Sequence, residues 1–175
     1  MNVHSVMQDR PASIAVSRPA LWLLLAAIAL LLSSPSSYAA KTVKVKAVVT
    51  AAEDLNPDYQ GRPSPVNIIV FQLVSADAFS SADFFSLFDP EAAVLGGDLL
   101  AKTQILLQPG ESREWVAEFA KETRFVGVIA AYRDIENAQW RATVALPKKG
   151  FISRFFRKNK LRIAVNSLAV TVSTK

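Results

Sequence analysis

The chain has 175 residues, of which 51% are hydrophobic and 20% charged, and its formal net charge is +5. It contains one histidine, His4, and no cysteine. The missing cysteine excludes disulfides and a lipid-modified cysteine. The lack of any further histidine excludes Ser-His and Cys-His nucleophile pairs and the usual zinc ligand sets. Stability must come from an apolar core, which a chain of this length can form as one domain.

An uninterrupted apolar run, Ala20–Leu32, follows two arginines and precedes the sequence SSPSSYAAK. These thirteen residues make about 20 Å of helix, less than the ~30 Å hydrocarbon core of a bilayer. A basic flank, a short apolar run and small residues near Ala39 are typical of a secretory signal. We therefore expect a cleaved signal peptide over residues 1–39 and one exported domain over residues 40–175.

The first half of that domain alternates strand and loop signals. Thr42–Thr50 alternates apolar and polar residues, which predicts a half-buried strand. Residues 51–64 contain Asn-Pro, glycine and further prolines, which indicates a long exposed loop. Residues 66–73 are apolar on both faces, which favours a central strand covered on two sides.

The pattern of residues 75–100 differs from that of the strands and indicates one or two short helices. Phe84, Leu87 and Phe88 have helical spacing, and Gly96-Gly97 ends the segment.

Strand patterns then return over residues 101–107, 112–119, 123–133, 139–146, 161–165 and 168–173. About eight strands without βαβ alternation predict an all-β fold, an antiparallel two-sheet β-sandwich with a short helical insertion.

Six segments carry a family resemblance. They are L-N-P-D-x-x-G-R-P-S-P-V (55–66), F-Q-L (71–73), A-D-F-F-S-L-F (82–88), L-L-x-P-G-E (106–111), V-G-V-I-A-A-Y-R-D (126–134) and Q-W-R (139–141). In this order and with these gaps, the chain resembles the TssJ (SciN, VasD) family of the type VI secretion system.

The resemblance implies a transthyretin-like sandwich that is a structural component rather than an enzyme and needs no cofactor. TssJ proteins bind the periplasmic C-terminal part of TssM, an inner-membrane protein, partly through the loop joining the first two strands. That loop is residues 51–64 here. Contacts with other membrane-complex subunits are also implied.

The chain departs from the family at its anchor. Family members are outer-membrane lipoproteins with a cysteine at the end of the signal, where this chain has Ala40. We expect a periplasmic protein that is soluble or tethered by a partner. The alternative is an inner-membrane anchor formed by uncleaved residues 20–32.

The long loop is the first candidate site, because loops on a rigid sandwich commonly carry binding groups. Tyr132, Arg133 and Asp134 end the most apolar strand and are expected at a rim beside this loop, a position equally compatible with an ordinary strand end. The competing interpretation of the loop itself is a solvated crossover shaped by its prolines and Gly61. The predicted partner-binding residues are Asn56, Pro57, Asp58, Tyr59, Arg62 and Pro63.

A basic and aromatic segment, residues 148–160, is the second candidate. Cations with phenylalanines can dock on an anionic membrane surface, which is the alternative function considered for the chain. Contact with a partner protein, or a loop whose phenylalanines cap the sandwich, fits the same pattern. Nucleic acid is not an expected partner of an exported protein. The candidate residues are Lys149, Phe151, Arg154, Phe155, Phe156, Arg157 and Lys158.

Catalysis is not expected. Glu111, Glu114, Glu118 and Glu122 recur along a strand and turn, where residues four apart share a face and usually meet water. The sequence places no acid pair at the ~5–10 Å spacing that glycoside hydrolysis requires. We predict no catalytic, cofactor-binding or metal-binding residues.

Overall fold

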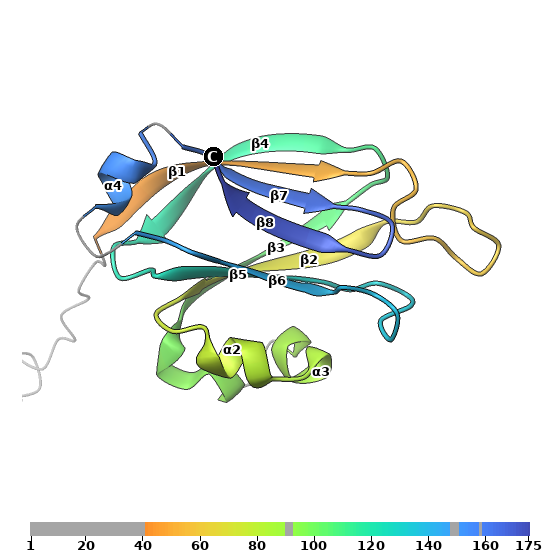
Figure 1. Ribbon diagram of the computed structural model, residues 1–175, viewed down its shortest axis with the longest axis horizontal. Helices are drawn as coiled ribbons and strands as arrows, with labels where there is room; N and C mark the ends of the chain where they lie inside the picture. The colour runs from red at the N-terminus through yellow and green to blue at the C-terminus, as the bar shows by residue number, and fades with distance from the viewer. Residues whose placement is uncertain (1–40, 90–92, 148–150, 158) are drawn as a thin grey trace, which may run out of the picture. The chain divides into compact units, whose positions relative to one another are not determined.

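Two four-stranded sheets face each other in the computed structural model, which describes residues 41–89, 93–147, 151–157 and 159–175 (Figure 1). Their strand orders are β4-β1-β7-β8 and β3-β2-β5-β6. The strands are β1 (Thr42–Ala51), β2 (Val66–Leu73), β3 (Leu99–Leu107), β4 (Ser112–Ala120), β5 (Phe125–Ala130), β6 (Arg141–Ala145), β7 (Leu161–Val165) and β8 (Val170–Thr174). The expected signal segment, residues 1–39, lies outside the described residues.

The predicted antiparallel two-sheet sandwich is confirmed, and one pair of its named strands departs from antiparallel pairing. β1 and β7 run parallel, with Ala47 opposite Leu161 and Ala51 opposite Val165. Parallel neighbours need a long crossover connection, and here all strands of the second sheet lie between β1 and β7 in sequence. Strand periodicity reveals which face is buried but does not reveal which strands are neighbours.

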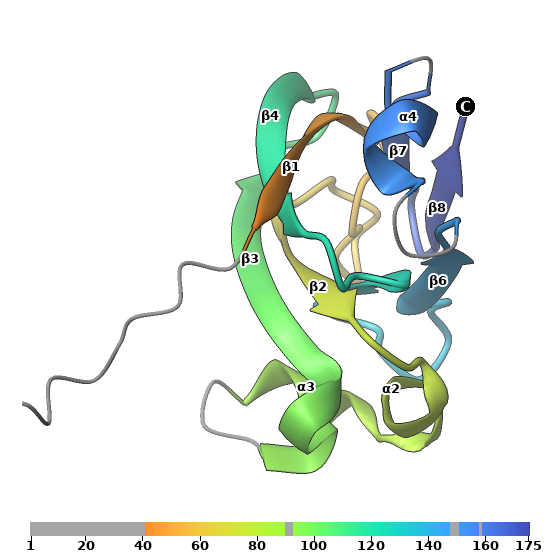
Figure 2. The same ribbon diagram turned by 90° about the vertical axis from the view of Figure 1, so that its left-hand side faces the viewer.

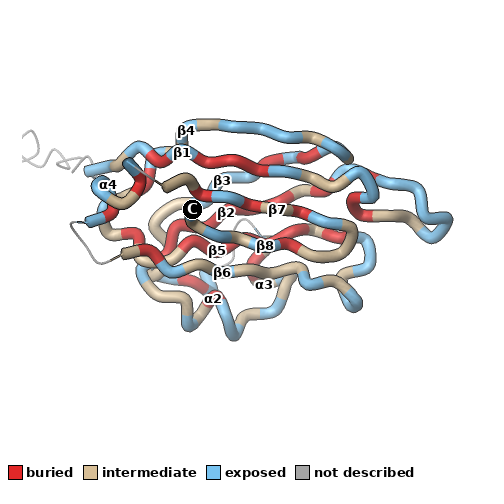
Figure 3. Tube along the Cα trace, turned by 45° about the horizontal axis from the view of Figure 1, so that its top comes forward, coloured by how far each residue is buried: buried red, intermediate tan, exposed pale blue. Residues whose placement is uncertain are grey.

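The facing sheets bury the alternating residues of β1 that the sequence indicated. Val45, Ala47 and Val49 have relative exposures of 0%, 1% and 0%. Val66, Ile68 and Val70 of β2 belong to the same core. In Figure 3 the buried stretches follow the facing strands, and the loop beyond β1 is largely exposed. This core supplies the rigid base for the loops.

A short helical layer covers the other face of the second sheet (Figures 1 and 2). β2 is apolar on both sides because its odd-numbered residues Ile69, Phe71 and Leu73 pack beneath this layer with Phe79 and Leu87. The layer consists of α2 (Asp77–Ser81), α3 (Phe84–Phe88) and the 3₁₀ segment η1 (Ala93–Asp98), and α4 (Ile152–Phe155) lies apart from it at one end of the sandwich.

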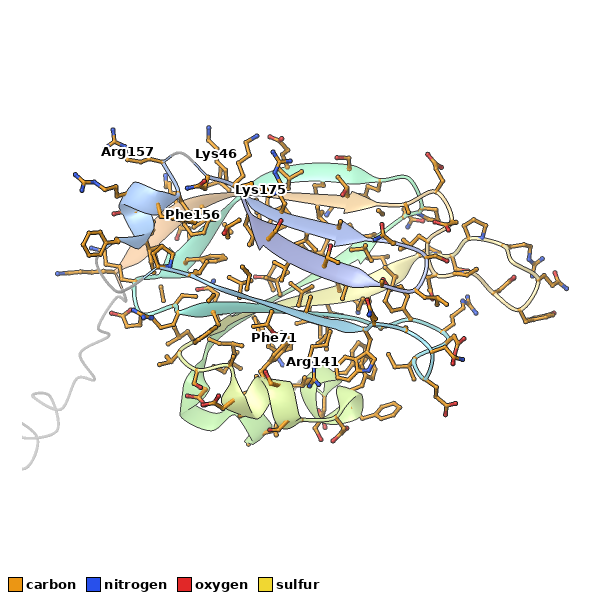
Figure 4. The ribbon with its side chains drawn as sticks, in the orientation of Figure 1. Lys46, Phe71, Arg141, Phe156, Arg157 and Lys175 are labelled. Atoms are coloured by element: carbon orange, nitrogen blue, oxygen red, sulfur yellow. The ribbon has the colours of Figure 1, made fainter. Side chains whose placement is uncertain are left out.

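Arg141 fastens this layer to β6. Its Nη1 donates to the carbonyl oxygens of Phe79 and Ala82, each at 2.8 Å, and its guanidinium lies 4.7 Å from the Trp140 ring centroid. Figure 4 shows Arg141 and Phe71 both directed from the sheet toward the helices. Arg141 is therefore a structural residue, because it satisfies carbonyl groups that a helix end would otherwise leave unpaired.

The strand predicted over residues 123–133 is shorter in the structure, where β5 ends at Ala130. After that residue the Ala131 N–H still donates to the Asn67 carbonyl, at 2.9 Å, but the chain turns toward the loop end of the sandwich.

Within the described part of the chain, no helix is long and apolar enough to span a bilayer.

Gly127 lies close against Phe79 of the helical layer. A Cβ atom on Gly127 would lie 2.6 Å from the Phe79 ring. We expect Gly127→Ala to lower the free energy of unfolding by about 1–3 kcal/mol, as overpacking does. Urea denaturation measures this change. Gly97→Ala is the control, because a Cβ there meets nothing within 4 Å. Adding Phe79→Leu to Gly127→Ala should recover part of the lost stability, because it removes the ring that the new Cβ meets.

Candidate functional site

The β1–β2 loop is closed at its base, so its middle forms a separate lobe. Leu55 is fully buried, and its carbonyl accepts a 2.9 Å hydrogen bond from the Ser64 N–H. Ser64 is also buried. Residues 56–63 therefore project from a fixed neck beyond the end of the sandwich (Figure 1).

Asn56 connects this lobe to two other segments. It has a positive φ of 46° and a relative exposure of 3%. Its Nδ2 donates to the Pro65 carbonyl and its Oδ1 accepts from the Arg133 N–H, both at 2.8 Å. Its own N–H donates to the Ser167 carbonyl at 3.0 Å. Asparagine tolerates this left-handed backbone better than most residues. The side chain predicted for partner contact is thus occupied in holding the loop.

Asp58 organises the tip of the lobe. Its carboxylate accepts from the N–H groups of Gln60 and Arg62, at 2.8 and 2.9 Å, and from Arg62 Nε at 2.7 Å. The backbone bond from Arg62 is the largest influence lowering the pKa of Asp58 below its usual value, and burial opposes it. Gly61, with a φ of 77°, donates its N–H to the Asp58 carbonyl. The lobe is consequently a hydrogen-bonded turn of defined shape.

The remaining predicted residues form the accessible surface. Tyr59 is 92% exposed, and the Arg62 side chain is 68% exposed. Pro63 is exposed and Pro57 is partly exposed. Tyr59 lines a hollow of about 500 Å³ together with Pro57, Asp58, Arg133, Asp134 and Leu168.

Two neighbouring segments complete this surface. Arg133 and Asp134 lie beside the loop, as their position at a strand end predicted. Leu168, from the turn between β7 and β8, was not predicted, because no sequence signal relates it to a loop about a hundred residues earlier. Tyr132 is buried and donates to the Asn166 carbonyl at 3.1 Å, and burial raises the pKa of its hydroxyl above the usual range. It supports the rim from below.

The second candidate segment separates into a buried part and an exposed part. Phe156 is 5% exposed, and its ring lies 6.2 Å from that of Phe119 in the core. Phe155 is partly buried, while Phe151, Arg154 and Arg157 are exposed. Lys149 and Lys158 lie outside the described residues. The phenylalanines therefore do not form one continuous exposed patch.

The described residues of the two surfaces form no cluster of metal-ligating side chains. Across the ranges that the structure describes, no group of three or more His, Cys, Asp or Glu side chains is placed to hold a metal ion. The loop end instead presents aromatic, guanidinium and carboxylate groups on a fixed backbone, an arrangement suited to binding.

The fold and the loop end define a two-sheet β-sandwich protein with a hydrogen-bonded loop at one end. The family comparison specifies it further. Residues 43–168 match the T6SS-SciN family, described as "Type VI secretion lipoprotein, VasD, EvfM, TssJ, VC_A0113". The chain belongs to this family of type VI secretion proteins. No curated protein matches the chain.

Solved structures agree with this assignment. The T6SS lipoprotein TssJ1 from Pseudomonas aeruginosa is 32% identical with a TM-score of 0.68, covering 77% of this chain and 98% of its own. A chain of a type VI membrane complex is 24% identical, covers 76% and 99%, and has a TM-score of 0.64. A chain of the structure named "T6SS protein TssM C-terminal domain (869-1107) from EAEC" is 24% identical, covers 76% and 98%, and has a TM-score of 0.58. The last two likenesses show the fold alone.

Replacing Asn56 should loosen the loop from the sandwich. We expect Asn56→Ala to lower the free energy of unfolding by about 1–3 kcal/mol, because buried partners lose their hydrogen bonds. Asn56→Gly should be less harmful, since glycine accepts the positive φ. Denaturant unfolding and hydrogen exchange of the Arg133 amide measure the two effects. Gln60→Ala, an exposed change in the same loop, is the control, and equal stability of all three variants would contradict the role of Asn56.

The Asp58 carboxyl should titrate below the ordinary aspartate value of 3.8, because the folded loop stabilises its charged form. A lowered pKa means that its stabilising contribution is present above the unfolded value and is lost as the pH falls through the folded value. Carbon-detected NMR should give the same low midpoint for Asp58 and for the Arg62 amide. In Asp58→Asn the amide transition should vanish; its persistence would show that another group controls the loop.

Proposed function

We propose that this chain is a structural component of a type VI secretion membrane complex and binds the periplasmic C-terminal region of a TssM-like inner-membrane protein. Membership of the TssJ family supports the complex, and the loop end supports the contact. The observation that carries the proposal is the lobe of residues 56–63, which is held by hydrogen bonds while its aromatic tip is exposed.

Tyr59 is the expected anchor of the contact. Its side chain is 92% exposed, and its hydroxyl oxygen accepts a hydrogen bond from Gln60 Nε2 at 3.3 Å. Tyrosine and arginine are enriched among the residues that dominate interface energies. Arg133 lines the same hollow, and Arg62 is paired with Asp58, another residue of its lining. Because the loop is already ordered, a partner would bind without a large entropic penalty for fixing it.

The proposed role is non-enzymatic, and the proposed location is the periplasm. The family is one of lipoproteins, but this chain has no cysteine to carry a lipid. Its position in the envelope would then depend on a partner, or on residues 20–32 retained as an inner-membrane anchor. Contacts with further subunits of the complex are part of the same proposal.

Tyr59→Ala tests the loop directly. We expect affinity for the periplasmic C-terminal region of the TssM-like protein of the same organism to fall at least about 30-fold, as for an aromatic hot spot. Calorimetry or surface-based binding measures the loss, and the thermal midpoint should not change because Tyr59 packs against nothing in the core. Phe85→Ala is the matched control, since Phe85 is 72% exposed on the helical layer.

Arg133→Ala tests the same surface by a second measurement of affinity. Arg133 binds Asn56 through its backbone N–H, which the substitution keeps, so the loop should stay in place. Weaker binding by both Tyr59→Ala and Arg133→Ala would locate the partner at the loop end. Full affinity in both variants, with the proteins folded, would show that the partner does not bind this surface.

A further inference from the structure

The sandwich end opposite the loop carries a group of exposed cations. Lys44 and Lys46 project from the outer side of β1, and Arg154 and Arg157 lie in and after α4. Lys175 is brought alongside by paired backbone hydrogen bonds with Lys160, at 2.6 and 3.1 Å. We call these residues and the neighbouring Phe151 the basic face; its members are Lys44, Lys46, Phe151, Arg154, Arg157 and Lys175.

The core fixes the orientation of this face. Ile152 and Phe156 are 2% and 5% exposed and anchor α4 to the sandwich. One turn of helix held from below on these two residues must direct Arg154 and Arg157 outward. In Figure 4, Phe156 lies beneath α4, whereas Arg157 points away from the body on the side where Lys46 and Lys175 are labelled. Figure 2 shows α4 at this end next to β7 and β1.

These cations are largely unneutralised. Lys160 is paired with Glu114 at 3.1 Å and therefore does not belong to the basic face. Glu118 lies opposite Lys44 on β4. Among the described residues, none of Lys46, Arg154 and Arg157 forms an ion pair within 4.0 Å. The face therefore retains a positive potential that would attract an anionic surface.

Two further features favour a lipid surface over an acidic protein. Phe151 is 57% exposed beside the cations, and an exposed phenylalanine beside cations is the pairing found in interfacial membrane contacts. Arg154, Phe155, Arg157 and Asn159 line a hollow of about 510 Å³, and guanidinium groups bind phosphate through charge-assisted hydrogen bonds.

The course of the chain points the same way. Lys41, the first described residue, accepts a 3.0 Å hydrogen bond from the Lys121 N–H, and Val43 and Lys121 share a small hollow with Ile152 of α4. The domain thus begins at the end that carries the basic face.

We propose that the basic face docks on an anionic phospholipid surface, with the cations at the headgroups and Phe151 entering between them. This orientation leaves the β1–β2 loop directed away from the membrane. The proposal does not depend on the identity of the protein bound by the loop, because the two surfaces lie at opposite ends of the sandwich (Figure 1).

The absence of cysteine allows a local test on the full chain. Phe151→Cys and, as the control, Tyr59→Cys are each labelled with an environment-sensitive fluorophore and mixed with vesicles. Vesicles of phosphatidylglycerol and phosphatidylcholine in equal parts are compared with pure phosphatidylcholine. The label at position 151 should shift to the blue only with the anionic vesicles, and the shift should be lost in high salt. The label at position 59 should not respond.

Charge variants test the same face by a vesicle-binding assay in which Phe151 is kept. Arg154→Gln with Arg157→Gln should weaken binding to anionic vesicles about 25-fold, about fivefold for each cation removed. Lys102→Gln with Arg113→Gln removes the same charge from β3 and β4, outside the basic face, and should leave vesicle binding unchanged. A position-151 label with equal emission in neutral and anionic vesicles would overturn the proposal, as would equal losses for both charge variants.

Discussion

The constraint on which this structure depends is that β2 must be covered on both faces. Its even-numbered residues enter the core between the sheets, and its odd-numbered residues pack under the helical layer. The helical insertion is therefore a required part of the fold, since without it Ile69, Phe71 and Leu73 would face water. Full burial of such side chains is worth about 1.5–3 kcal/mol each. Covering this face with helices leaves the ends of the sandwich open, and both proposed surfaces lie there.

The loop end shows how a rigid scaffold can present a binding surface without a deep cleft. Asn56 joins the loop to the segment after β5 through one hydrogen bond and to the β7–β8 turn through a second, and a third, to the Pro65 carbonyl, closes the loop on itself. Asp58 then closes the tip around Arg62. Two short polar side chains thus constrain the loop locally, as a disulfide does in small disulfide-bonded domains. The exposed Tyr59 is held at the end of this ordered turn, so binding energy need not be used to order the loop.

Much of the fold, and less of the site, could be predicted from the sequence. The alternation in β1 and the two apolar faces of β2 predicted their burial correctly, because side-chain period reports directly on face. The parallel β1–β7 pair and the contribution of Leu168 could not be predicted, because both depend on contacts between segments far apart in the chain. Asn56 and Phe156 were candidates for partner or membrane contact, and both side chains are buried. Residue type singles out candidate segments, but only the tertiary packing determines which side chains in them point outward.

The two ends of the sandwich differ in charge, and this difference gives the proposed functions a direction. Carboxylates outnumber cations around the loop, where the described charged residues are Glu53, Asp54, Asp58, Arg62, Glu111, Arg113, Arg133, Asp134 and Glu136. Cations dominate at the α4 end. β1 connects the two ends, and its ten residues span about 33 Å. An anionic bilayer attracts one end and repels the other, so the same charges that bind the surface also orient the domain. In a chain without a cysteine for lipid attachment, that orientation would present the loop to a partner even when no acyl chain holds the domain in place.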